Sequence, residues 1–244
     1  MCYCGAVLVS LFFFCFIGYQ FIDEIKILYF DIYLNDIVKH LTLRQEFCIV
    51  LYADDIILLS PSVSGLQNLF DNCERELLLL DMCINVKKSC CMRIGPRNDM
   101  FCANITTSSG HTLPWVDEIR YLGIFITKSR NFKVSLHHAK RSFYRATNAI
   151  LGKVGRAASE EVIIQLVNCK CLPILLYGLE ACALNKSDKK SLDFAINRLL
   201  MKLFCTNNIA IIADCRLMLG IKLPSEILPQ RCTQFIAKVA EITL

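Results

Sequence analysis

Residues 47–60 read Phe-Cys-Ile-Val-Leu-Tyr-Ala-Asp-Asp-Ile-Ile-Leu-Leu-Ser. Two apolar, β-prone runs, Cys48–Leu51 and Ile56–Leu59, flank a centre that holds two adjacent carboxylates. Short runs of this kind on either side of a turn are typical of paired strands. The stretch therefore predicts a β-hairpin with Asp54 and Asp55 at its tip.

The two acids at this tip indicate a metal site. A turn explains one Asp, because its short side chain bonds the local backbone. Two adjacent ionised carboxylates repel each other, and a divalent cation beside them offsets that repulsion. Oxygen ligands suit Mg²⁺, which shares its coordination positions with waters and substrate phosphates. The pattern therefore predicts phosphoryl or nucleotidyl transfer.

The hairpin also resembles a known family. Tyr52-Ala53-Asp54-Asp55 is similar to the metal-binding hairpin of reverse transcriptases, and the residues after it narrow the resemblance to the non-LTR, LINE-type retrotransposon enzymes. The resemblance implies an RNA-directed DNA polymerase in which Asp54 and Asp55 are catalytic and hold Mg²⁺ or Mn²⁺. It also implies an RNA template, a DNA primer and dNTP as partners, and an intracellular location in the nucleus or cytoplasm.

A second motif follows the hairpin. Val63–Leu80 has apolar residues at helical spacing behind Ser62, a good N-cap. Asp81–Ser89 then resembles the family's Gly-Leu-x-x-Asn-x-x-Lys-Ser, with Asp81 in place of the glycine. The resemblance implies that Lys88 is a catalytic residue near the incoming triphosphate, and a solvated lysine at a strand start is the alternative.

A third motif and a basic segment follow. Tyr121-Leu122-Gly123 resembles the family's primer-grip hairpin, where glycine allows close approach of a nucleic-acid backbone, although glycine also marks an ordinary bulge. Ile119–Ser159 has nine Lys or Arg and no Asp or Glu, while the chain's net charge is +5. A basic segment of this kind predicts a polyanionic partner. The nucleic-acid-binding residues that we expect are Tyr121, Leu122, Gly123, Lys133, Lys140, Arg141 and Arg145. The alternative for the basic helix face is a solvated surface.

The first 22 residues carry no charged side chain. A run of this length is close to the roughly 20 residues that span a bilayer, so a membrane anchor is one interpretation. The alternative is that residues 1–27 are unrelated to the rest, because the resemblance begins at about Leu28. The family uses a third metal-binding carboxylate on an upstream strand, and no upstream residue matches it. We therefore expect a truncated enzyme that is inactive alone, or a non-catalytic remnant that binds nucleic acid.

The resemblance continues to about Arg231 and implies the architecture. Residues 28–128 are expected to form an α+β fold, a partial right-hand polymerase palm of antiparallel hairpins with a packing helix. Residues 129–244 are expected to form an all-helical thumb and C-terminal region, mostly core-forming, with helices over 132–156, 159–169 and 188–204.

The chain has 15 cysteines. Disulfide scaffolds are typical of short secreted chains that lack a sufficient core, and this chain is long enough to build one. Free cysteine behaves as a small apolar residue, and Cys73 falls within the apolar pattern of a helix. We expect structural thiols in a reducing compartment, with no disulfide partner.

Overall fold

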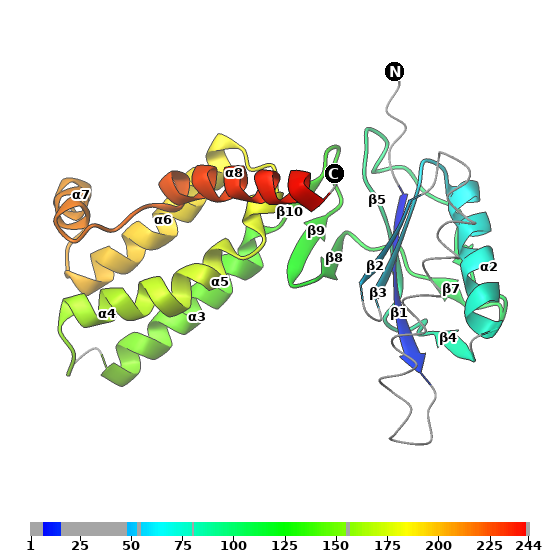
Figure 1. The fold of residues 1–244 in the computed structure, drawn as a ribbon, viewed down its shortest axis with the longest axis horizontal. Coiled ribbons are helices and arrows are strands. Elements are labelled where there is room, and N and C mark those ends of the chain that lie inside the picture. Colours follow the sequence, from blue (N-terminus) through cyan, green and yellow to red (C-terminus); the bar gives the residue numbers. More distant parts are fainter. Residues whose placement is uncertain (1–6, 16–47, 53–54, 80, 155–156, 243–244) are drawn as a thin grey trace. The chain divides into compact units, whose positions relative to one another are not determined.

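The predicted hairpin over residues 47–60 is confirmed. In the computed structural model, β2 (Cys48–Tyr52) and β3 (Asp55–Ser60) pair antiparallel, from Cys48 opposite Leu59 to Tyr52 opposite Asp55. The structure describes residues 7–15, 48–52, 55–79, 81–154 and 157–242 (Figure 1). Contacts divide the chain into a first unit, Met1–Lys133, and a second unit, Val134–Leu244.

The sheet of the first unit is built around β1 (Val7–Cys15). This strand pairs antiparallel with β3 along one edge, and with β4 (Met82–Ile84) and β5 (Cys90–Arg93) along the other. The strand order is β2-β3-β1-β4, with β5 also on β1. This differs from the expectation that residues 1–27 stand apart. An uncharged run is also what a strand with neighbours on both sides requires.

No helix among the described residues is long and apolar enough to cross a membrane. Apart from β1, the first 27 residues, on which the anchor interpretation falls, lie outside the described part of the chain.

The predicted helix behind the sheet is α2 (Val63–Leu79). The Ser62 hydroxyl accepts a hydrogen bond from the Gly65 backbone N–H at 3.1 Å, which is the expected N-cap. Its buried face packs against β3 and β5 through Leu66, Leu69, Phe70, Cys73, Leu77, Ile56, Leu58 and Cys91. This core fixes the position of β3, the strand that begins at Asp55.

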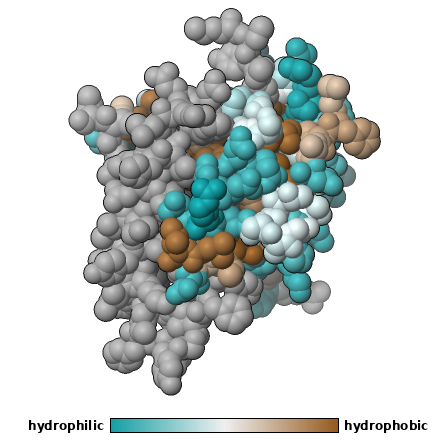
Figure 2. All heavy atoms as spheres, turned by 90° about the vertical axis from the view of Figure 1, so that its right-hand side faces the viewer, coloured by the Kyte–Doolittle hydropathy of each residue, from teal (hydrophilic) through white to brown (hydrophobic). Residues whose placement is uncertain are grey.

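Figure 2 shows the side of the molecule that carries α2. The coloured residues on that side form a mixed surface, with hydrophilic regions beside apolar patches. Leu78 and Leu79, at the end of α2, expose 51% and 70% of their surface. The amphipathic pattern of the sequence therefore breaks down only in the last turn of the helix.

Two further hairpins complete the first unit. β6 (Ile105–Thr106) and β7 (Thr112–Leu113) pair around a turn that contains Gly110 at φ +82. β8 (Glu118–Tyr121) and β9 (Ile124–Thr127) pair next, and β10 (Lys133–Val134) adds to β9 at the end of the unit. Helix α3 (Leu136–Val154) therefore begins later than the predicted residue 132, because β10 precedes it.

The second unit is helical. After α3 come α4 (Glu160–Leu166), a π-helical turn η1 (Val167–Cys171), α5 (Leu172–Leu176) and a 3₁₀ turn η2 (Leu179–Ala181). Helices α6 (Lys186–Leu203), α7 (Ile209–Met218) and α8 (Pro224–Ile242) follow. Asn185 and Asp188 form a capping box that starts α6.

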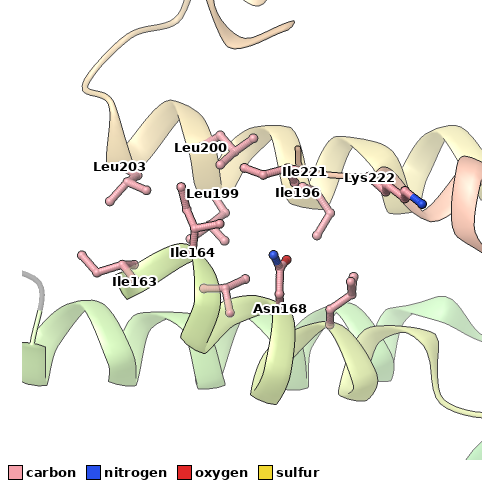
Figure 3. Close-up of a pocket in the computed structure, with 11 residues that line it drawn as sticks. Ile163, Ile164, Asn168, Ile196, Leu199, Leu200, Leu203, Ile221 and Lys222 are labelled. Carbon is pink, nitrogen blue, oxygen red and sulfur yellow. The ribbon is translucent and has the colours of Figure 1, made fainter. Parts of the chain in front are cut away.

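Apolar side chains join these helices into one core. Figure 3 shows side chains of α6 facing those of α4 and Asn168 of η1. They line a small, mostly apolar pocket together with Ile221 and Lys222. The expected core role of this region is only partly correct, because Tyr177 and Phe194 expose 60% and 54% of their surface.

Candidate metal site and nucleic-acid surface

The hairpin places Asp55 at the end of two strand ladders. Asp55 is the first residue of β3, opposite Tyr52 of β2 and Phe12 of β1. Its side chain is half-buried. Asp54, the other predicted ligand, lies outside the described residues. The backbone of Asp55 is thus fixed from both sides, which holds its carboxylate at one end of the sheet.

The register of β1 brings the Lys88 motif to the same end. Phe13 of β1 pairs with Ile84 of β4, and Ser10 pairs with Cys90 of β5. The turn between β4 and β5, residues 85–89, therefore lies across β1 from Asp55. Asp55 and this turn thus lie on opposite sides of β1.

The turn of the Lys88 motif is held by one carbonyl. The Asn85 carbonyl accepts hydrogen bonds from the backbone N–H groups of Lys88, at 3.0 Å, and Ser89, at 2.9 Å. The Lys88 side chain is exposed. Asp81, which replaces the family's glycine, has φ +56, a left-handed conformation that glycine adopts at little cost.

Tyr121 lies close enough to Asp55 to be affected by its charge. Burial raises the pKa of the Tyr121 phenol, and the Asp55 carboxyl and the Tyr52 phenol raise it further. A negative charge beside a phenol disfavours the phenolate, so Tyr121 keeps its proton. The structure thus brings two of the predicted motifs together, although they are far apart in the sequence.

The Tyr-Leu-Gly motif forms the tip of the β8–β9 hairpin. Tyr121 pairs with Ile124, which leaves Leu122 and Gly123 as a two-residue loop. Their φ angles are +45 and +82, as a type I′ turn requires. Leu122 is an unusual residue for this position, and 37% of its surface is exposed. The glycine serves the turn rather than a bulge.

The described residues provide one of the predicted carboxylates and no complete metal site. Within the described ranges, no group of three or more His, Cys, Asp or Glu side chains is placed to hold a metal ion. The neighbouring strand β1 has no Asp or Glu in its sequence. The half-buried Asp55 suits a hard cation such as Mg²⁺, but it needs further oxygen ligands.

The predicted basic residues lie on β10 and α3. Arg141 and Arg145 are exposed, and Lys133 is exposed on β10. Lys140 is half-buried and its ammonium donates a hydrogen bond to the Ser191 hydroxyl of α6 at 2.7 Å. Lys140 therefore lies at the junction of two helices, where it remains partly exposed.

Two cations of α6 were not predicted. The Arg198 guanidinium lies over the Tyr144 ring at 5.9 Å, and Lys202 donates a hydrogen bond to Asn148 at 2.9 Å. The sequence places Lys140, Tyr144 and Asn148 at four-residue intervals, a signal that they share one face of α3. The spacing within α3 does not show which other helix packs against that face.

Comparison with known proteins covers part of the chain. Residues 27–126 match the family model described as reverse transcriptase (RNA-dependent DNA polymerase). A putative uncharacterized transposon-derived protein of Caenorhabditis elegans is 28% identical over 140 residues, which cover 56% of this chain and 49% of that protein. The chain thus spans about half the length of this relative. Residues 27–126 are thus similar to reverse transcriptase domains, and the relative is a transposon-derived protein.

Proposed function

We propose that this chain derives from the reverse transcriptase of a LINE-type retrotransposon. Residues 28–128 would be a partial palm, whose sheet also includes β1, and residues 129–244 a helical thumb. The order of the Tyr-Ala-Asp-Asp, Asn-x-x-Lys-Ser and Tyr-Leu-Gly motifs supports the proposal. The family match over residues 27–126, which includes all three motifs, agrees with it.

The main support for the proposal is the position of Asp55 and of the Lys88 turn. They lie at the same height along β1, one on each side of that strand. Asp54 and Asp55 would hold Mg²⁺ or Mn²⁺, which when bound supplies activation of the primer 3′-hydroxyl and stabilisation of the leaving pyrophosphate. Lys88 offers a positive charge to the triphosphate of a dNTP. Burial and the nearby Asp55 carboxyl raise the pKa of Tyr121, so its neutral phenol adds no negative charge beside Asp55.

The same arrangement supports the expectation that part of the two-metal catalytic site is missing. A two-metal site needs carboxylates from more than one strand, and the strand beside β3 is β1, whose sequence has none. We expect the purified chain to show no template-dependent dNTP incorporation with Mg²⁺ or Mn²⁺, as measured by primer extension. Incorporation that disappears in Asp54→Ala would show that another carboxylate completes the site.

A second candidate function is nucleic-acid binding without catalysis. The exposed Arg141 and Arg145 on α3, a helix with no acidic residue, favour it. Sequence-independent contacts of this kind give dissociation constants of about 10⁻⁴ to 10⁻⁶ M at physiological salt. Reversing both arginines to Glu should abolish binding to a primer–template duplex, as measured by fluorescence anisotropy. If the double variant binds the duplex as well as the parent does at every salt concentration, the basic face of α3 is only a solvated surface.

A further inference from the structure

Three cations line the seam between α3 and α6. Lys140 of α3 contacts Ser191, Arg198 of α6 contacts Tyr144, and Lys202 of α6 contacts Asn148. All three contacts lie within the second unit. The α3 positions 140, 144 and 148 are spaced by four residues, about 6 Å along the helix axis at each step. The seam therefore presents positive charge at regular intervals.

The partners of these cations are neutral. A hydroxyl, an aromatic ring and an amide hold them, and each cation keeps further N–H donors for another acceptor. Helix α3 has no acidic residue. In α6, Asp188 belongs to the N-terminal capping box, and Asp193 accepts a hydrogen bond from the Ser225 backbone at the start of α8. Both acids of α6 thus accept hydrogen bonds from backbone groups outside the seam.

An exposed aromatic residue lies beside these charges. Phe194 exposes 54% of its surface. It is three residues after Ser191 and four before Arg198 on α6, so the three share one side of that helix. Cations that follow a phosphate backbone, next to an aromatic face on which a base stacks, are the features of a surface that binds single strands.

We propose that the α3–α6 seam binds one unpaired nucleic-acid strand, with backbone phosphates on Lys140, Arg198 and Lys202 and a base stacked on Phe194. This inference rests on the proposed function, from which it takes nucleic acid as the partner. It adds that the bound strand is single and that residues of α6 contact it. A duplex keeps its bases stacked inside, so it would use the cations without Phe194.

The test uses fluorescence anisotropy with the full chain and fluorescein-labelled oligo(dT), oligo(U) and a duplex of the same length. The binding constant is measured at several salt concentrations, and its logarithm is plotted against the logarithm of the salt concentration. For oligo(dT) and oligo(U), Arg198→Gln with Lys202→Gln should make this slope shallower by about 1.4, since each phosphate contact on a single strand contributes about 0.7. The matched control, Lys170→Gln with Lys238→Gln, removes two exposed charges from η1 and α8 and should leave the slope near that of the parent.

Phe194→Leu keeps an apolar surface and removes the ring. It should weaken single-strand binding about fivefold or more, with little effect on the duplex or on heparin. Equal slopes for the seam variant and its control, or unchanged single-strand affinity in Phe194→Leu, would overturn the proposal. Thermal unfolding of every variant establishes that the fold is kept. The proposed function is tested separately at Asp54 and Asp55, so failure at the seam leaves it standing.

Discussion

Asp55 and the turn that carries Lys88 lie at one level of the sheet, with β1 between them. The proposed contact of Lys88 with a dNTP triphosphate can be tested against a matched control. Lys87 is that control, because both lysines are exposed in the same turn. We expect Lys88→Gln to weaken binding of a fluorescent dATP analogue about tenfold in Mg²⁺, as for loss of one charged hydrogen bond. Lys87→Gln should leave it unchanged, and equal effects would mean that Lys88 is only a solvated lysine.

The place of β1 makes a stability prediction. Deleting residues 1–15 removes the strand that bonds to β3, β4 and β5 and exposes the edges of all three. The first unit should lose its cooperative unfolding transition in urea. Deleting residues 1–4, which precede β1, serves as the control. If the longer deletion unfolds as cooperatively as the parent, β1 contributes little to the sheet.

Leu122 is expected to destabilise the β8–β9 hairpin. Asn is favoured at positive φ in type I′ turns, whereas Leu is not. Leu122→Asn should raise the free energy of unfolding by about 0.5–1 kcal/mol. Leu122→Ala is the control, because alanine has the same conformational penalty at φ +45 and should bring no gain. The measurement is urea unfolding, and equal stability of the Asn and Ala variants would contradict the assigned turn.

Buried thiols predict weakening at alkaline pH. Burial, with smaller contributions from Glu74 and Glu76, raises the pKa of Cys73 from 9.0 to about 12. Below pH 9 the thiol is neutral in both states, and above it the unfolded thiol ionises first. The free energy of unfolding should therefore fall between about pH 9 and 12, by up to about 1.4 kcal/mol per pH unit for this group. Cys73→Ala should be less stable at pH 7 but show a shallower fall, and an identical pH dependence would contradict the assignment.

Local pattern was sufficient for several elements. The hairpin of β2 and β3 and helix α2 with its Ser62 cap follow from β-prone runs, helical spacing and turn residues over short stretches. The β8–β9 hairpin was expected from the resemblance of Tyr121-Leu122-Gly123 to the primer-grip hairpin. Their boundaries agree with the structure to within a few residues, apart from α3, where the two-residue strand β10 is too short for any periodic signal.

The pairing of segments that are far apart in the chain could not be predicted from local sequence pattern. Val7–Cys15 has the composition of either an anchor or a central strand, and only its partners decide between them. The proximity of Tyr121 to Asp55 and the facing of Lys140 toward Ser191 depend in the same way on how elements meet. Residues that act together across two elements are therefore the part of the site that spacing alone misses.

On the proposed function, the hairpin tip holds a divalent cation beside β1 and the Lys88 turn. Iron(II) in place of Mg²⁺, with ascorbate and peroxide, cleaves the backbone close to the bound ion. We predict cleavage at three places, near Asp55, near Phe12 and within residues 85–89, suppressed by excess Mg²⁺ and lost in Asp54→Asn combined with Asp55→Asn. Cleavage that is absent, or that persists unchanged in this double variant, would contradict the claim.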